Sequence, residues 1–293
     1  MVMVVLTPAT ENYLKSIFAM TSIGELVTTG GLAHELGVSS PSVTAMVKRL
    51  QDAELLERSG GRAVRLTGRG EQLALRVVRR HRLLETFLVA ALDLGWDEVH
   101  AEAELLEHAL SERLEDRIDA LLGHPTRDPH GDPIPPRVGR HDEAWGQRLD
   151  TAPAACRFRV ERVSDRDSAA LRYLGEMGVV PGAVLDVAEQ TPFGGPLWIV
   201  IDGHRHGLGA PLTRLVHGHI DPEHGSTEHD TAEHDTAEHD VEPAGQITAQ
   251  RATTQPTGGS VTSTDDGTGT GTDRPAARVQ TGSRRPARTV PTW

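Results

Sequence analysis

Cysteine, aromatic residues and long apolar runs are scarce in this chain, and these shortages exclude several classes of protein. Cys156 is the one cysteine among 293 residues, which excludes an intrachain disulfide framework, a thiolate-rich zinc site and an iron–sulfur cluster. No apolar run reaches the roughly 18 residues that a membrane span needs. Residues 1–8 have neither the basic region nor the cleavage site of a signal peptide. We therefore expect a cytoplasmic protein without membrane contacts.

Charge is unevenly distributed along the chain, whose overall net charge is −12. Residues 1–80 carry 10 basic and 7 acidic side chains, whereas residues 81–220 carry 14 basic and 23 acidic ones. A basic segment followed by an acidic one suggests a nucleic-acid partner for the first and a cation for the second.

The final segment, residues 221–293, contains no Leu, Phe, Tyr or Met. Such a composition buries too little apolar surface to offset the entropy lost on ordering. We predict a disordered tail rich in His, Asp, Thr and Gly. Its repeats around His229, His234 and His239 could bind divalent metal loosely, but a solvated tail is the favoured interpretation.

Residues 1–72 have the pattern of a winged helix-turn-helix domain. A helix is expected over 8–22, and a short one carrying Leu32 and Leu36 should end at Gly37. Ser39 or Ser40 can cap the next helix, and Pro41 suits its first turn. The outward side of that helix is small or basic, as a helix that reads a DNA groove requires.

Residues 55–67 are expected to form two strands about a Gly-Gly turn, which would make a basic wing. Wing arginines are placed for phosphates, and the preceding helix for bases. An ordinary helical bundle with a surface hairpin is the less favoured alternative. The DNA-binding residues predicted are Ser39, Pro41, Ser42, Thr44, Lys48, Arg58, Arg62 and Arg65.

Histidine and glutamate recur at helical spacing in residues 73–142, the expected metal-binding and dimerisation domain. His81 and Glu85 lie one turn apart on a helix predicted over 70–92. Oxygen and imidazole donors without a thiolate suit Mn²⁺, Fe²⁺, Co²⁺ or Zn²⁺, and many carboxylates favour Mn²⁺. No phosphate loop or catalytic motif accompanies them. One face of a second helix, predicted from about 96 to 118, carries His100, Glu104, Glu107 and His108.

The C-terminal part reads as a linker, 143–155, followed by a small β-rich domain, 156–220. Residues 156–163 alternate as a half-buried strand does, and a short helix is expected over 169–174. Further strands are predicted between Gly and Pro turns at 184–188, 197–201 and 204–208. Their order suggests an SH3-like barrel, so the fold class is mainly α with a small β domain.

Taken together, residues 8–220 resemble the diphtheria toxin repressor family of metal-dependent transcriptional regulators, and within it the manganese-responsive branch. The motifs that carry the resemblance are the winged helix-turn-helix, RRHRLLE at 79–85, WDEVHAEAELLEH at 96–108 and RDPHGDPIP at 127–135. The resemblance implies the three domains above.

The resemblance also implies two metal sites in each subunit. Iron-responsive members carry methionine at the position of Asn12 and cysteine at that of Glu104, whereas the manganese branch has glutamate at the latter and usually aspartate at the former. The SH3-like barrel would contribute Asp167 as a further ligand of the second site. The implied primary ligands are Asn12, Glu104, Glu107 and His108, and the implied second ligands are His81, Glu85, His100 and Asp167.

The function implied is a homodimeric repressor of metal-homeostasis genes that is activated by Mn²⁺, binds double-stranded operator DNA and has no small organic substrate. It would not be an enzyme. Three alternatives remain at this point: an iron-dependent repressor of the same family, a hydrolase with a two-metal site, and a metal-buffering protein.

Overall fold

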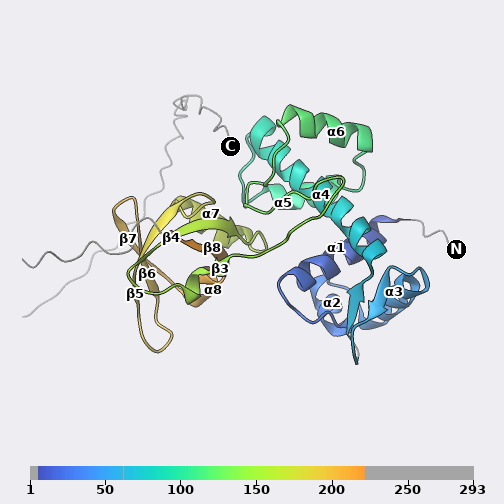
Figure 1. The fold of residues 1–293 in the computed structure, drawn as a ribbon, viewed down its shortest axis with the longest axis horizontal. Coiled ribbons are helices and arrows are strands. Elements are labelled where there is room, and N and C mark those ends of the chain that lie inside the picture. Colours follow the sequence, from blue (N-terminus) through green and yellow to red (C-terminus); the bar gives the residue numbers. More distant parts are fainter. Residues whose placement is uncertain (1–5, 62, 222–293) are drawn as a thin grey trace, which may run out of the picture. The chain divides into compact units, whose positions relative to one another are not determined.

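The N-terminal part of the chain folds as three helices and a hairpin (Figure 1). The structure is a computed structural model that describes residues 6–61 and 63–221. Tyr13, Leu14 and Ile17 of the first helix are buried in one core with the two helices that follow. The elements are α1 (Pro8–Ser22), α2 (Thr29–Glu35), α3 (Ser40–Asp52), β1 (Leu56–Arg58) and β2 (Val64–Leu66).

Local signals set the helix-turn-helix as the sequence predicts. Gly37 takes a positive φ of 64° after α2, a conformation in which a Cβ would be strained. The Ser39 hydroxyl accepts a hydrogen bond from the backbone N–H of Ser42 and caps α3. Val43, Val47 and Leu50 are buried, so the opposite side of α3 is free to contact DNA. On that side or at the cap, Ser39, Pro41, Ser42, Thr44 and Lys48 are all exposed.

The wing is the antiparallel hairpin of β1 and β2, in which Leu56 pairs with Leu66. Arg58 and Arg65 are exposed on it. Arg65 Nε donates a 2.7 Å hydrogen bond to Glu57 Oε1 across the hairpin. Arg62 lies outside the described residues.

The middle of the chain contains α4 (Gly68–Leu92), α5 (Val99–Leu106) and α6 (Glu112–Leu121). The single helix expected from about 96 to 118 was wrong, because the chain turns between α5 and α6. Ser111 has an extended backbone, and its hydroxyl accepts a 3.3 Å hydrogen bond from the N–H of Leu114. A serine followed by glutamates is a helix start signal, and here it separates this part of the chain into two helices.

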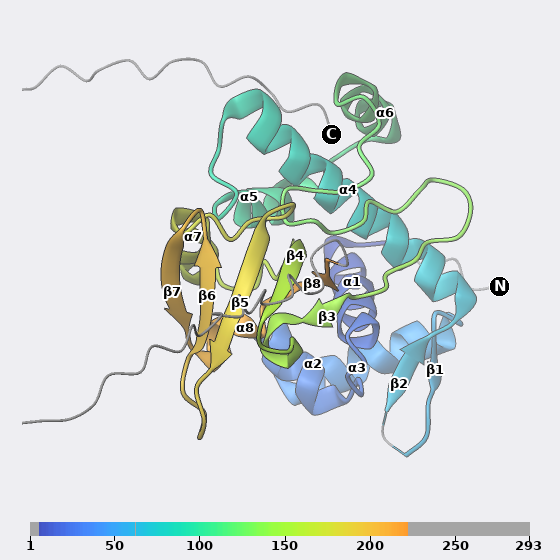
Figure 2. The same ribbon diagram turned by 60° about the vertical axis from the view of Figure 1, so that its left-hand side comes forward.

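The C-terminal domain is a six-stranded antiparallel sheet in the order β3-β8-β4-β5-β6-β7, with α7 packed on it (Figure 2). Residues 147–151 of the expected linker belong to this domain, because Leu149 is fully buried in its core. The fold class is therefore confirmed. The elements are β3 (Gln147–Arg148), a 3₁₀ turn η1 (Leu149–Thr151), β4 (Cys156–Val163), α7 (Ser168–Glu176), β5 (Val184–Gln190), β6 (Leu197–Ile201), β7 (His204–Leu208), α8 (Ala210–Thr213) and β8 (Val216–Ile220).

Two further expectations concern the tail and the membrane. All of the tail predicted over 221–293 except Asp221 lies outside the described residues. Among the helices that the structure describes, none has the length and apolarity to cross a membrane.

Gly70 tests how α4 joins the DNA-binding domain. A Cβ at Gly70 would clash with the backbone carbonyl of Leu55, whereas a Cβ at Gly68 in the same helical turn meets nothing. We expect Gly70→Ala to lower the free energy of unfolding by about 2 kcal/mol, the scale of overpacking. Gly68→Ala should stay within about 0.5 kcal/mol of the wild type. Urea unfolding of both variants measures the difference, and equal stabilities would contradict this packing.

Candidate metal centre

Two helices and one loop bring the metal-binding residues together. Along α4, His81 and Glu85 follow one another by one turn and face the same way. The second helix, α5, carries His100 and Glu104, and Glu107 is its C-terminal cap. Glu85 and Glu107 are fully buried. A buried carboxylate is costly unless a positive or hydrogen-bonding partner lies close to it. Both glutamates therefore require such partners.

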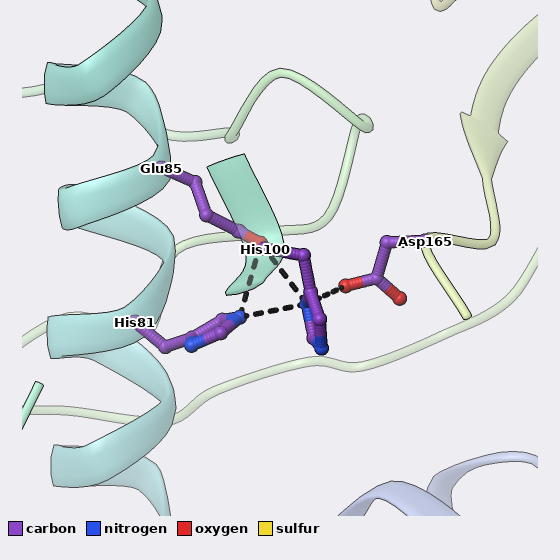
Figure 3. A group of neighbouring side chains, drawn as sticks. All are labelled: His81, Glu85, His100 and Asp165. Carbon is purple, nitrogen blue, oxygen red and sulfur yellow. Dashed lines mark hydrogen bonds and ion pairs between the residues drawn. The ribbon is translucent and has the colours of Figure 1, made fainter. Parts of the chain in front are cut away.

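One group of donors, here called the Asp165 cluster, consists of His81, Glu85, His100 and Asp165 (Figure 3). Glu85 Oε1 is 3.0 Å from His81 Nε2 and 3.3 Å from His100 Nδ1. His100 Nδ1 is 2.8 Å from Asp165 Oδ2 and 3.1 Å from His81 Nε2. Ligands about 2.1 Å from one ion at right angles lie about 3 Å apart, so these separations fit a shared metal ion.

The charges of the Asp165 cluster compensate one another. Burial alone would lower the pKa of His81, but Glu85 and Glu107 outweigh it and raise that pKa to about 9. The pKa of His100 is likewise raised to about 10, against the effect of burial, by hydrogen bonds to Asp165 and Glu85. Burial would raise the pKa of Asp165, but the hydrogen bond from His100 holds it well below its usual range. A ligating imidazole must be unprotonated. A metal ion that binds to His81 and His100 would therefore replace a proton on each ring.

A second group, here called the Lys15 cluster, consists of Lys15, His81, Glu104 and Glu107. Lys15 Nζ donates to Glu104 Oε1 at 2.6 Å and to the two carboxylate oxygens of Glu107 at 2.7 and 2.9 Å. It is also 3.4 Å from His81 Nδ1. The ligand atoms of His81, Glu104 and Glu107 lie within 4.8 Å of one another. An ammonium therefore lies among three groups that could bind a metal.

His108 lies next to this cluster without completing it. His108 Nδ1 is 2.6 Å from Glu11 Oε2, while its Nε2 is 3.5 Å from Glu107 Oε1. The buried oxygen Oδ1 of Asn12 and the buried Nε2 of His108 have no hydrogen-bond partner among the described residues. An unsatisfied buried imidazole nitrogen 3.5 Å from a carboxylate, and an unsatisfied buried amide oxygen, are groups that could bind a cation. The donor set of Asn12, Glu104, Glu107 and His108 thus fits a divalent metal.

His81 faces both clusters through its two ring nitrogens. Nδ1 is 2.6 Å from Glu107 Oε2, and Nε2 is 3.0 Å from Glu85 Oε1. A neutral imidazole offers one lone pair, so His81 can ligate in one cluster at a time. Lys15, His81, Glu85, His100, Glu104 and Asp165 line a single cleft of about 600 Å³, which gives a cation access to both groups.

Asp165, and not the Asp167 that the resemblance implies, lies among the converging donors. The Asp167 carboxylate caps α7 by accepting 3.0 Å hydrogen bonds from the backbone N–H groups of Ala169 and Ala170. It lies outside every group of converging donors in the described chain, whereas Asp165 lies 2.8 Å from His100. An aspartate directly before a serine-led helix is a capping signal, and that signal was available in the sequence.

Sequence reasoning missed Lys15, Glu11 and a third buried group. Lys15 follows Asn12 by three residues and therefore shares its helix face, which is a signal that could have found it. The third group is Glu85, Asp128 and His130. His130 Nε2 lies 2.7 Å from the carbonyl of Trp96. Burial, followed by the charge of Asp132, raises the pKa of Asp128. Only the fold could have brought Glu85 close to Asp128 and His130, which lie 43 and 45 positions further along the chain.

Three consecutive segments match known protein families. Residues 5–64 match the family described as "Iron dependent repressor, N-terminal DNA binding domain". Residues 67–136 match "Iron dependent repressor, metal binding and dimerisation domain". Residues 147–217 match the FeoA domain. The metal clusters described above draw most of their donors from the second of these segments.

Individual proteins agree with this assignment. The iron-dependent repressor IdeR of Mycobacterium tuberculosis is 38% identical over 215 residues, which cover 69% of this chain and 92% of IdeR. The diphtheria toxin repressor of Corynebacterium diphtheriae is 34% identical over 130 residues, 44% of this chain and 58% of that protein. A solved manganese-dependent transcriptional repressor in complex with manganese is 40% identical with a TM-score of 0.67, covering 72% of this chain and 99% of its own. The structure of the manganese regulator SloR is 30% identical with a TM-score of 0.64, and the match covers 74% of this chain and 100% of the SloR chain.

The chain therefore belongs to the iron-dependent repressor family, the family of IdeR and the diphtheria toxin repressor. It is a metal-dependent, DNA-binding transcriptional repressor of that family, and the resemblance predicted from its motifs is confirmed. Because the relatives are repressors and not enzymes, the hydrolase alternative is not supported.

Asp165 and Asp167 provide a matched pair for testing the centre. Asp165→Ala should weaken Mn²⁺ binding by about tenfold or more, the scale found for groups that hold metal ligands, and should leave α7 capped. Asp167→Ala should cost about 1 kcal/mol of stability through loss of the cap and leave metal affinity unchanged. Calorimetric titration with Mn²⁺ and thermal unfolding measure the two effects, and the reverse pattern would restore Asp167 as the ligand.

Proposed function

We propose that this chain is a manganese-activated repressor that binds operator DNA as a homodimer and holds two metal ions in each subunit. The observation that carries the proposal is the donor set: carboxylates and imidazoles from α4 and α5, with no thiolate among them. Glu104 supplies a hard oxygen ligand, the type that Mn²⁺ accepts readily.

Each proposed site has its own histidine. The primary site would use Asn12, Glu104, Glu107 and His108. The second would use His81, Glu85 and His100, with Asp165 in place of Asp167. This division respects the single lone pair of a neutral imidazole, because His81 then serves the second site alone.

The primary site joins α1 to α5, and this gives the chain a route from metal to DNA. Asn12 lies on α1, whose apolar side is buried in the core of the DNA-binding domain with Val43 and Val47 of α3. Glu104 and Glu107 belong to α5. A bound divalent ion would supply the positive charge that holds these oxygens together. Fixing α1 against α5 would set the separation of the two recognition helices in the dimer.

The separation of the recognition helices decides operator binding. Half-sites one DNA turn apart require recognition helices about 34 Å apart. A ligand that binds the DNA-competent arrangement more tightly shifts the population toward it. Such a repressor would act in the cytoplasm, where its operator is.

Iron is the second candidate activator, and one observation favours it: the IdeR relative at 38% identity is named an iron-dependent repressor. Manganese is supported by the 40% identical repressor solved with manganese and by the glutamate at position 104. Raw affinity cannot favour Mn²⁺ over Fe²⁺ at a nitrogen and oxygen site. Selectivity would therefore lie in how well each ion aligns α1 with α5.

Metal choice is tested by operator binding titrated anaerobically with Mn²⁺, Fe²⁺ and Co²⁺. We expect micromolar Mn²⁺ to activate the wild type. Glu104→Cys should move the response toward Fe²⁺ or Co²⁺ because a thiolate is a softer ligand, and Asn12→Asp should raise Mn²⁺ affinity by adding a negative charge. Full activation by Fe²⁺ but not by Mn²⁺ would overturn the manganese assignment and leave the repressor assignment standing.

The DNA surface is tested by separating phosphate contacts from base contacts. Replacing Arg58 or Arg65 with Ala should weaken binding to all DNA sequences alike. It should also make the fall of the logarithm of the binding constant with the logarithm of salt concentration less steep, by about one per lost phosphate contact. Replacing Ser42 or Thr44 on α3 should change base preference instead. An unchanged salt slope in the wing variants would show that the wing does not contact phosphates.

A further inference from the structure

Lys15 has no part in the function proposed above, yet its ammonium lies among the donor atoms of the primary site. It makes three hydrogen bonds of 2.6 to 2.9 Å, all to carboxylate oxygens of Glu104 and Glu107. The Lys15 side chain is 14% exposed and that of Glu107 is 0% exposed. The chain has only one other lysine, Lys48. An ammonium held this closely by two carboxylates, one of them fully buried, offsets part of their negative charge.

The helix that carries Lys15 is held in place, while the Lys15 side chain has space beside it to move into. Leu14 and Ile17 of α1 are fully buried in the core of the DNA-binding domain, so the backbone is held in place. The lysine stem has four flexible carbons and ends in a compact charge. The stem also lines the cleft of about 600 Å³. The ammonium can therefore leave the carboxylates without any movement of α1.

Lys15 and a divalent ion compete for the same atoms. Glu104 Oε1 and both oxygens of Glu107 accept protons from Lys15, and these are the oxygens that the primary site would offer to a metal. Two cations in contact with one pair of carboxylates repel each other. His108 is held in a corresponding way, with its Nδ1 2.6 Å from Glu11 Oε2. The two glutamates of the primary site thus already have a partner of opposite charge within the chain.

We propose that Lys15 is a built-in counter-cation of the primary site. It offsets part of the negative charge of Glu104 and Glu107 and holds α1 against α5 while no divalent ion is bound, and a divalent ion binds these glutamates by displacing it. Lys15 therefore weakens metal binding and sets the metal concentration at which the repressor responds. This inference rests on the proposed function for the identity of the site.

The test is the Mn²⁺ affinity of the full chain, read from the electron paramagnetic resonance signal of free Mn²⁺. Lys15→Met keeps a long, unbranched side chain that is one atom shorter and removes its charge. We expect it to lower the dissociation constant of one class of sites by about tenfold or more, the scale on which groups beside metal ligands act. Lys15→Arg, which keeps the charge, should bind Mn²⁺ much as the wild type does. Arg76→Met removes an equal charge from an exposed ion pair of α4 with Glu112 and should also leave the affinity unchanged.

Two further measurements locate the effect. The substitution Glu85→Gln is chosen to disable the second site. In a protein that carries it, Lys15→Met must still increase the affinity for Mn²⁺. In EDTA, Lys15→Met should have a lower Tm than the wild type because Glu104 and Glu107 lose their partner, and Mn²⁺ should raise its Tm by more than it raises that of the wild type. If the variant unfolds without metal, refolding on addition of Mn²⁺ supports the proposal, and failure to refold overturns it.

An affinity of Lys15→Met equal to or weaker than that of the wild type would overturn the proposal, as would a gain that disappears in the Glu85→Gln background. The same measurements distinguish failure of the proposed function from failure of the role of Lys15. If the wild type binds Mn²⁺ but its operator binding does not depend on the metal, the function falls and the role of Lys15 stands. If operator binding is metal-dependent and Lys15→Met changes nothing, only the role of Lys15 falls.

Discussion

The negative charge of Glu104 and of the fully buried Glu107, held against α1, is the constraint on which this structure depends. A buried carboxylate without a cation costs several kcal/mol, so Glu107 favours a positive group at the junction of α1 with α5. Lys15 supplies that group in the chain itself. A divalent ion would supply a larger charge to the same oxygens, and this makes the junction responsive to metal.

The same constraint links the metal centre to the DNA-binding surface. One side of α1 contributes Leu14 and Ile17 to a core shared with α3, and Lys15 of the same helix contacts Glu104 and Glu107. A change of cation at the junction would therefore act on a helix that shares one core with the recognition helix. Packed cores transmit such changes because they deform little.

The sequence predicts what depends on local spacing and fails where tertiary structure decides. The cap at Ser39, the turn at Gly37 and the pairing of His81 with Glu85 follow from neighbours within one helical turn. The break before α6 carried a local signal at Ser111, which the longer apolar pattern concealed. The approach of Asp165 to His100 joins residues 65 positions apart, and no local pattern contains it. Lys15 was hidden for a further reason, since a lone lysine on a helix ordinarily lies in solvent.

The most direct test of the account is the distance between the two α3 helices of the dimer with and without Mn²⁺. Cys156 is the only cysteine, so a Cys156→Ser chain with Ala45→Cys, an exposed position of α3, carries one spin label per subunit. Pulsed dipolar spectroscopy should give a broad distribution in EDTA. With Mn²⁺ it should give a narrow distribution that matches recognition helices about 34 Å apart. A distribution that Mn²⁺ leaves unchanged would contradict the claim that a cation between α1 and α5 sets the separation of the recognition helices.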